Sequence, residues 1–302
     1  MDEKVKQAFI DMSESSQDLW IPRRVESITN IEPLTFYRNY VARNIPVIIK
    51  GGCKHWPALT NWTNEYLTNK IKNKVTVALT PDGHGDAIKN NQFVLPFEAS
   101  MNLGEFFDVL KDKSNVPYIQ KQCSSLSTEY VELVSDVPRI QWADIAFGQE
   151  PDAINLWIGD ERAISSTHKD PYENIYCVVS GTKEFTLLPP TDTPFLYRQH
   201  YPISQYNAQL EIVSTDQGTV PWVSVDPDNP DLVKFPLFQH ASPIIATVEK
   251  GDILYLPSLW YHKVKQYPDA NGRTIAVNFW YDMIFDARFT WSQFQDKMVG
   301  LI

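Results

Sequence analysis

A dense succession of short strand patterns between residues 153 and 282 most constrains what this chain can fold into. Stretches rich in β-branched and aromatic residues alternate there with turn residues such as Gly, Pro, Asp and Asn. Ser180-Gly181-Thr182 predicts a tight hairpin turn between two of these strands. Many short strands with such turns indicate a mainly β fold, either a sandwich or a barrel. The expected strands are Ala153–Ile158, Tyr176–Val179, Glu184–Leu188, Ile244–Val248, Ile253–Leu256 and Thr274–Tyr281.

Segments with helical spacing flank this region on both sides. Near the C-terminus a helix is predicted by the 3-4-3 spacing of Trp291, Phe294, Met298 and Leu301. This helix either packs on its own domain or pairs with its copy in a homodimer. Residues 190–243, rich in Pro, Asp, Asn and Gln, are expected to form a long insertion that serves as a lid or an ordered decoration. Toward the N-terminus we expect helices over residues 1–20, 33–43, 63–72 and 103–112 and strands at 45–50, 75–79 and 116–120.

Composition indicates a folded protein with an acidic surface. Of the 302 residues, 43% are hydrophobic and 13% aromatic, enough for a sizeable core. The net charge of −10 disfavours direct nucleic-acid binding and suits a basic partner, although it also serves solubility alone. Cys53, Cys123 and Cys177 form no CxxC pair, which suits a reducing compartment. No leader and no stretch of membrane-spanning length is found, so we expect a cytoplasmic and also nuclear protein with no membrane partner.

One short run, Ser165 to Asp170, carries metal-ligand chemistry. His168 and Asp170 are two positions apart, so on a strand both side chains leave the same face. A third ligand must come from another strand, and His262 is the candidate. Two imidazoles and one carboxylate leave open metal positions, as in non-haem Fe(II) oxygenases, whereas a structural zinc site needs four protein ligands. The remaining histidines are expected to be structural or solvent-facing: His55, His84, His200 and His240.

Lys183 strengthens the prediction of an iron site. It follows Gly181 at the start of a strand, on the expected inner face of the barrel. A buried ammonium group is costly unless it meets an anion. The distal carboxylate of 2-oxoglutarate would be that anion. Without the His168 run, a solvated lysine beside a hairpin turn would be the simpler interpretation.

Several segments together resemble one known family. The chain is similar to JmjC-domain Fe(II)/2-oxoglutarate oxygenases of the small, cupin-like branch, over nearly its whole length. The segments that carry the resemblance are Ile45–Val47, His55–Trp62, Thr80–Gly83, Tyr118–Ser124, Asn155–Gly159, Ser165–Asp170, Tyr172–Tyr176, Gly181–Lys183, Gly251–His262 and Ala276–Asp282.

The resemblance implies a fold and a division of the chain. The fold would be a double-stranded β-helix, the jelly-roll or cupin-like JmjC barrel, with a helical N-terminal region and a C-terminal helix. Residues 1–125 would pack on the barrel, and residues 126–284 would form it, with an insertion at about 190–243. Residues 285–302 would form the last helix, a candidate dimer contact.

By position, the resemblance also implies the roles of individual residues. His168, Asp170 and His262 would bind Fe(II) and form the catalytic centre. Lys183 would pair with the far carboxylate of 2-oxoglutarate, while the other end of this cosubstrate and O2 meet the metal. Polar groups that bind the cosubstrate or orient the site are implied at Tyr118, Ser165, Asn174 and Asn278. Two aromatic residues either line the same pocket or belong to the core: Tyr176 and Trp280.

The resemblance further implies a peptidyl-lysine hydroxylase that acts on translation-associated, developmentally regulated GTP-binding proteins. Three carboxylates, Glu173, Asp282 and Asp286, are expected to flank the mouth of the site and attract an ammonium group. Residue chemistry leaves open N-methyl-lysine demethylation of histones, because both reactions begin by removing hydrogen from an unactivated carbon. A catalytically silent cupin-like binding protein and a hydrolase also remain open, although the sequence has no GxSxG and no HExxH pattern.

Overall fold

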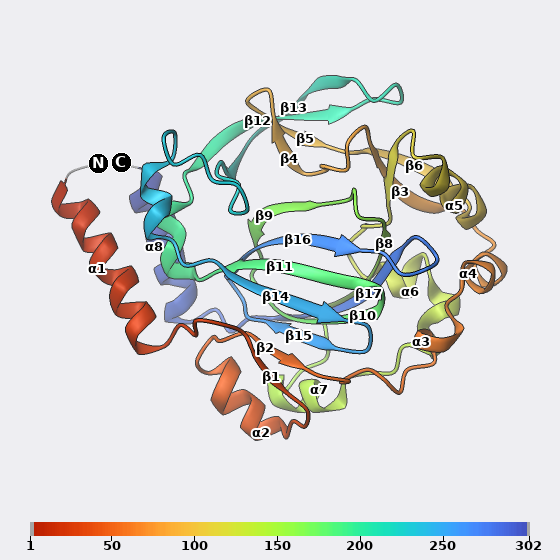
Figure 1. Ribbon diagram of the computed structural model, residues 1–302, viewed down its shortest axis with the longest axis horizontal. Coiled ribbons are helices and arrows are strands. Elements are labelled where there is room, and N and C mark those ends of the chain that lie inside the picture. Colours follow the sequence, from red (N-terminus) through yellow and green to blue (C-terminus); the bar gives the residue numbers. More distant parts are fainter. Residues whose placement is uncertain (1–2, 301–302) are drawn as a thin grey trace.

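Two β-sheets lie face to face at the centre of the molecule, which is described for residues 3–300 by a computed structural model (Figure 1). The larger sheet has the strand order β1 (Glu26–Ile28), β2 (Val47–Ile49), β15 (Ile253–Leu256), β10 (Tyr172–Ser180), β17 (Thr274–Asp282) and β8 (Ala153–Gly159). The smaller sheet has the order β14 (Ile244–Glu249), β11 (Thr182–Leu188), β16 (Tyr261–Tyr267) and β9 (Ser165–Lys169). Most strands predicted from the sequence are therefore present, and the predicted mainly β, cupin-like fold class is confirmed.

Alternation of side chains along β10 explains why the two sheets stack. Tyr176 and Val178 pack with residues of β11 and β14 in the core between the sheets. Ile175, Cys177 and Val179 point to the opposite face and pack under the N-terminal segments. A strand buried on both faces has no polar side to show, which is why this stretch is almost continuously apolar.

The turn at Gly181 differs from the prediction of a hairpin. β10 pairs with β15 and β17, whereas β11 pairs with β14 and β16, so the turn carries the chain from one sheet to the other. Gly181 has a φ of +70°, and a Cβ atom there would lie 2.6 Å from the carbonyl oxygen of Tyr267. Glycine is required here because of the positive φ and the close approach of another chain segment. Both conditions occur in hairpins and in connections between sheets, so the glycine alone does not distinguish the two.

Two smaller sheets extend the central pair. The N-terminal half contributes β6 (Phe97–Met101), β3 (Val75–Thr80) and β7 (Val116–Tyr118), which form one of them. The predicted insertion forms much of the other, because its hairpin pairs in parallel with β5. This sheet has the order β13 (Ile212–Val223), β12 (Arg198–Tyr206), β5 (Gln92–Leu95) and β4 (Ala87–Lys89), and it lies beside β9 at the top of Figure 1. The insertion also contains η3 (Pro190–Phe195) and η4 (Pro236–His240).

Helices cover the outside of the sheets. The helix predicted over residues 33–43 is divided into a short α-helix and a π-helix, and the helix predicted over residues 1–20 is described from Glu3 to Leu19. In residues 3–300, no helix combines the length and the apolarity needed to cross a membrane. The helices are α1 (Glu3–Leu19), α2 (Pro33–Phe36), η1 (Tyr37–Val41), α3 (Ala58–Asn61), α4 (Asn64–Lys70), α5 (Leu103–Asp112), α6 (Ser125–Thr128), η2 (Val131–Asp136), α7 (Gln141–Phe147) and α8 (Ala287–Gly300).

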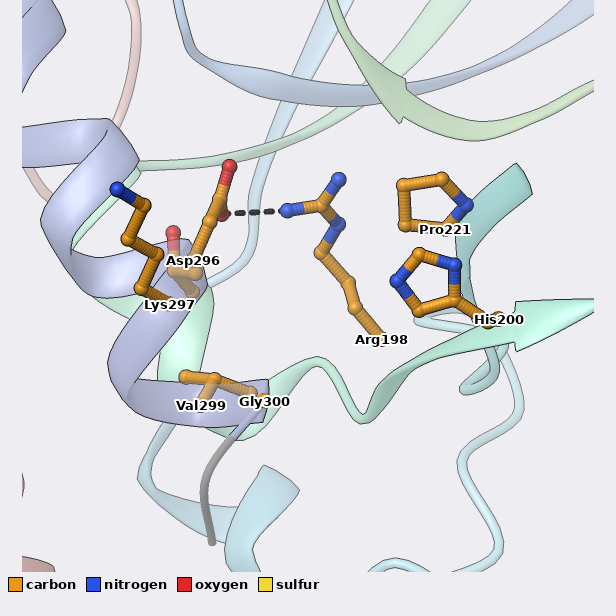
Figure 2. A pocket seen from close by; sticks show the side chains of 8 residues that line it. Arg198, His200, Pro221, Asp296, Lys297, Val299 and Gly300 are labelled. Carbon is orange, nitrogen blue, oxygen red and sulfur yellow. Dashed lines mark hydrogen bonds and ion pairs between the residues drawn. The ribbon is translucent and has the colours of Figure 1, made fainter. Parts of the chain in front are cut away.

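The C-terminal helix α8 is held by its polar side. Asp296 pairs with Arg198 of the insertion (Figure 2), and it also accepts from Lys169 Nζ at 3.0 Å. Trp291 and Phe294, which the sequence places on one apolar stripe, are each 48% exposed and stack on each other. The predicted stripe therefore faces outward. Leu301, its last predicted member, lies outside the described residues.

Candidate active site

Three side chains, two on paired strands and one directly after a strand, form a compact group of metal-ligand atoms. His262 on β16 lies directly opposite His168 on β9, and Asp170 follows the end of β9. Asp170 Oδ2 lies 3.7 Å from His168 Nε2 and 3.7 Å from His262 Nε2. One ligand atom of each residue lies within 4.8 Å of the others. Bonds of about 2.1 Å to one ion are compatible with such separations.

Both imidazole rings are oriented by backbone carbonyls. His168 Nδ1 lies 2.7 Å from the carbonyl oxygen of Ser166, and His262 Nδ1 lies 3.1 Å from that of Trp260. The Nδ1 atoms donate in these contacts, so the Nε2 atoms present lone pairs to a metal. Burial, assisted by neighbouring His168, lowers the pKa of His262 to about 4. A neutral imidazole is the form that binds a metal.

This donor set fits Fe(II) better than a closed structural site. Two imidazole nitrogens and one carboxylate occupy one face of an ion and leave positions for further ligands. When bound, iron with 2-oxoglutarate and O2 supplies an oxidant that replaces a hydrogen on carbon by hydroxyl. His168, Asp170 and His262 would hold that iron.

A narrow cavity beside the triad is lined by the remaining residues expected around the cosubstrate, except Lys183. The larger sheet supplies one wall, since β10 and β17 place Asn174 opposite Trp280 and Tyr176 opposite Asn278. The predicted residues that line the cavity are Tyr118, Ser165, Asn174, Tyr176, Asn278 and Trp280, together with the three candidate ligands.

Two asparagines in this wall form a fixed hydrogen-bond chain. Trp157 Nε1 donates to Asn278 Oδ1 at 2.8 Å, and Asn278 Nδ2 donates to Asn174 Oδ1 at 3.2 Å. The amide of Asn278 is therefore oriented by its neighbours. In the sequence Trp157 is only one residue of the family motif Asn155–Gly159, and the structure gives it a specific contact in the site.

A bulge in β9 brings Ser165 to the same side as His168. Ser165 pairs with Val264 while His168 pairs with His262, so β9 has one more residue than β16 between these positions. Simple alternation would place Ser165 and His168 on opposite faces, yet both line the cavity. A bulge of this kind redirects a side chain at a strand edge.

Lys183 is enclosed at the inner end of the site. Its side chain is 1% exposed, and its Nζ lies 2.6 Å from Gln266 Oε1 and 3.3 Å from Tyr118 Oη. Within residues 3–300 no carboxylate forms an ion pair with it. Burial lowers the pKa of Lys183 to about 7. A buried ammonium with only neutral partners fits a site for an incoming carboxylate such as that of 2-oxoglutarate.

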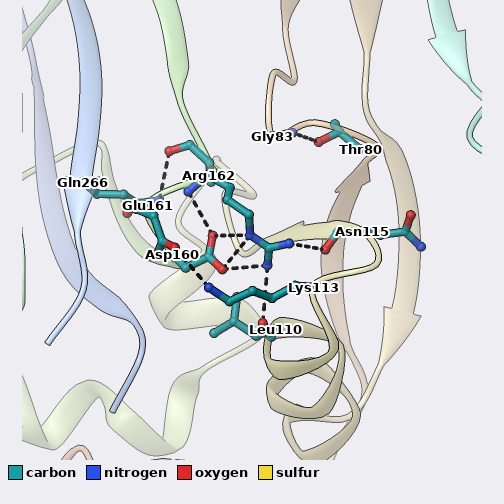
Figure 3. A network of polar contacts seen from close by, with 10 residues as sticks. Thr80, Gly83, Leu110, Lys113, Asn115, Asp160, Glu161, Arg162 and Gln266 are labelled. Atoms are coloured by element: carbon teal, nitrogen blue, oxygen red, sulfur yellow. Dashed lines mark hydrogen bonds and ion pairs between the residues drawn. The ribbon is translucent and has the colours of Figure 1, made fainter. Parts of the chain in front are cut away.

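The loop between β8 and β9 connects this site to the N-terminal half of the chain (Figure 3). Arg162 pairs with Asp160 at 2.6 Å and donates to the carbonyl oxygens of Leu110 and Asn115. Gln266, the partner of Lys183, donates to the carbonyl oxygen of Ala163 in the same loop. Contacts with the N-terminal half and with Gln266 therefore hold the loop that leads into β9.

One expected surface carboxylate is not at the mouth of the site. Glu173 is 2% exposed, and its carboxylate accepts from Tyr255 Oη at 2.7 Å and from Ser258. It precedes Asn174 on β10 and therefore points away from the cavity. Asp282 and Asp286 are exposed, and Asp286 pairs with Arg288. Other cavity residues were not predicted from the sequence: Gln122, Phe185 and Val264.

A two-histidine, one-carboxylate face inside a β-sandwich, with a buried lysine nearby, defines the class as a cupin-type metal oxygenase. The profile of the family described as "Cupin-like domain" matches residues 33–287. The chain belongs to the cupin-like JmjC family, which consists of 2-oxoglutarate oxygenases, and it is an enzyme of that kind.

Several known proteins are similar to the chain over most of their length. The human "Bifunctional peptidase and (3S)-lysyl hydroxylase JMJD7" is 39% identical over 98% of this chain and 96% of its own. "JmjC domain-containing protein E" of Dictyostelium discoideum is 39% identical over 95% of this chain and 92% of its own. "Lysine-specific demethylase JMJ32" of Arabidopsis thaliana is 38% identical, with coverage of 95% and 92%.

Proposed function

We propose that this protein is an Fe(II)- and 2-oxoglutarate-dependent hydroxylase of a lysine side chain in a protein substrate. The observation that carries the proposal is the likeness, over 98% of the chain, to a human (3S)-lysyl hydroxylase, combined with the triad of His168, Asp170 and His262. The substrate we propose is a translation-associated, developmentally regulated GTP-binding protein.

The residues of the candidate site have different roles according to their positions. The triad would hold Fe(II), and Lys183, in its protonated form, would meet the far carboxylate of 2-oxoglutarate. Tyr118 is within reach of the same carboxylate because its hydroxyl lies 3.3 Å from Lys183 Nζ. Aromatic walls at Tyr176 and Trp280 exclude water, which keeps the oxidant for the substrate.

N-methyl-lysine demethylation is the second candidate. The Arabidopsis relative is named a lysine-specific demethylase, and it is almost as similar to this chain as the human hydroxylase. Both reactions use the same iron site and differ in which carbon approaches it. The name of the human relative also includes a peptidase, so cleavage of the substrate belongs among the products to be measured.

The experiment is mass spectrometry of a developmentally regulated GTP-binding protein after incubation with the enzyme, Fe(II) and 2-oxoglutarate. A His168→Ala variant serves as the control. Gain of one oxygen on a lysine, dependent on 2-oxoglutarate and absent with the variant, would support the proposal. Loss of methyl groups from a trimethyl-lysine histone peptide, without hydroxylation of the GTP-binding protein, would favour the demethylase. Succinate formation with neither product would retain the oxygenase and reject this substrate.

We further propose a homodimer formed through α8 and an action in the cytoplasm and the nucleus. The stacked pair Trp291 and Phe294, together with exposed Ile284 and Phe285, supports a covered apolar surface. Free cysteines, one of them the exposed Cys123, support a reducing compartment.

A further inference from the structure

An outer cavity opens next to the iron ligands. It adjoins the inner cavity, since both are lined by Gln122, Trp157, Ser165, His168 and Asp170. The residues that line only the outer part are Gly85, Asp86, Phe93, Gln120, Ser166, Lys169 and Trp222. This space can hold a substrate side chain that extends away from the metal site.

The walls of the outer cavity are aromatic on the side of the insertion. Trp222 of β13 stacks on His168 with ring centroids 5.9 Å apart and an interplanar angle of 11°. Trp222 also contacts Phe93 at a centroid distance of 4.5 Å. Its Nε1 donates to Ser166 Oγ at 3.0 Å, which fixes the ring. Such walls suit the methylene stem of a long cationic side chain.

Asp86 is the carboxylate that remains available in this cavity. Asp170, the other carboxylate in the lining, belongs to the candidate metal centre. The cationic group of Lys169 is already engaged, since its Nζ lies 2.8 Å from Ser292 Oγ and 3.0 Å from Asp296 Oδ1. Asp86 Oδ2 accepts from Gln120 Nε2 at 3.1 Å. In the part of the chain that the structure describes, no Lys, Arg or His lies within ion-pair distance of Asp86.

The backbone around Asp86 is fixed relative to the iron ligands. Gly83 has a φ of +86°, and its carbonyl oxygen accepts from Ile164 N at 3.0 Å. Ser166, on the strand that carries His168, donates from Oγ to the carbonyl oxygen of Asp86. Asp86 itself has a φ of +52°, a conformation that only surrounding contacts maintain in most residues. These contacts hold the carboxylate of Asp86 at a fixed place beside the candidate metal centre.

From this arrangement we propose that Asp86, oriented by Gln120, binds the ammonium group of the substrate lysine while the aromatic wall at Trp222 contacts its stem. The inference rests on the proposed lysyl hydroxylase function and adds the specificity-determining residue to it. Oxidation of a carbon near the backbone, as the "(3S)" of the human relative's name states for that protein, leaves the ammonium group a side-chain length from the iron. The ammonium group then requires a polar subsite of its own, apart from the iron. Burial raises the pKa of Asp86, and a bound cation would offset that effect.

A binding experiment tests the subsite without turnover. The enzyme is loaded with Zn(II) and 2-oxoglutarate, so that Asp170 is bound to the metal and does not compete for the probe. Ligand-observed NMR then compares the binding of N-acetyl-lysine methylamide with that of its norleucine analogue. The two probes differ only in the ammonium group. We expect the lysine probe to bind the wild type about 10-fold more tightly and the preference to vanish in Asp86→Asn. Asparagine accepts a positive φ, so this variant is expected to fold.

Asp82→Asn is the matched control, because it removes the same charge from the same loop at an exposed residue that pairs with Lys89. Equal or absent binding of the two probes to the wild type, or a preference that persists in Asp86→Asn, overturns the inference. The activity assay separates it from the proposed function. If Asp86-dependent lysine binding occurs but no lysine gains oxygen, the subsite stands and the hydroxylase proposal fails. If lysine gains oxygen equally well with Asp86→Asn, the hydroxylase stands and the subsite fails.

Discussion

Lys183 and Gln266 face each other across the β11–β16 pair, with Lys183 Nζ 2.6 Å from Gln266 Oε1. The amide of Gln266 is oriented because its Nε2 donates to the carbonyl oxygen of Ala163 at 3.1 Å. The lysine therefore has a fixed neutral acceptor on one side and Tyr118 on the other. This geometry holds the ammonium group at the inner end of the cavity and leaves its charge without a counter-ion among the described residues.

Replacing Lys183 by Met is expected to raise the apparent KM for 2-oxoglutarate by about 10- to 100-fold. This factor corresponds to the usual free energy of a charge-assisted hydrogen bond. Met keeps the length of the side chain and removes the charge. Lys265→Met is the control, since Lys265 lies on the adjacent strand but pairs with Asp228. Succinate release measures both variants. An unchanged KM in Lys183→Met would reject its assigned role.

Binding of 2-oxoglutarate is expected to weaken as the pH rises above 7. Burial lowers the pKa of Lys183 to about 7, so the free enzyme carries the charge below that pH and loses it above. Binding the carboxylate to neutral Lys183 requires uptake of a proton, so the dissociation constant rises about tenfold per pH unit above the pKa of the free enzyme. Calorimetric titration from pH 6 to pH 9 measures it. Lys183→Met should lack this slope, and an equal slope in both proteins would assign it to another group.

Loss of one candidate ligand is expected to remove both metal and activity. His168→Ala or Asp170→Ala leaves two donors where three meet within 4.8 Å, so iron retained after dialysis and the rate should fall by at least about 100-fold. His55→Ala is the matched control because His55 is exposed. Elemental analysis measures the iron content, and circular dichroism shows whether the variant is still folded. Full iron binding by either ligand variant would contradict the assignment.

Gly83→Ala is expected to destabilise the fold by more than about 2 kcal/mol. A Cβ atom there would lie 1.8 Å from the carbonyl oxygen of Arg162, in a loop that cannot yield without moving β9. Gly218→Ala offers the comparison, since its φ of +80° is similar but no atom lies within 4 Å of the added Cβ. That variant should cost only about 1 kcal/mol of backbone strain. Urea denaturation measures both, and equal losses would show that the contact with Arg162 is unimportant.

Charging the exposed face of α8 is expected to dissociate the proposed dimer. Trp291→Glu combined with Phe294→Glu places two carboxylates where two aromatic rings stack. Light scattering after size-exclusion chromatography should give twice the monomer mass for the wild type and the monomer mass for the variant. Val233→Glu, which changes another exposed apolar side chain, should stay dimeric. A monomeric wild type at micromolar concentration would reject the dimer.

Much of the fold and the central part of the site could be predicted because they depend on local periodicity. Strand alternation placed His168 and Asp170 on one face, and the β-branched and aromatic stretch Tyr176–Val179 predicted a strand that forms part of β10. The helical stripe of Trp291 and Phe294 predicted a helix correctly. That stripe did not reveal which side of α8 packs, because Ser292 and Gln295 are the buried residues.

The sequence by itself determined the strand periods and the side on which His168 and Asp170 lie, because both follow from residue type and a period of two. Only the tertiary structure decided the features that join distant segments. It inserted the bulge that turns Ser165 inward, directed the chain through Gly181 to the second sheet, and buried Glu173. It also brought Trp222 onto His168 and Asp86 beside the candidate metal site. Contacts of this kind depend on packing between elements far apart in the chain, and no local pattern encodes them.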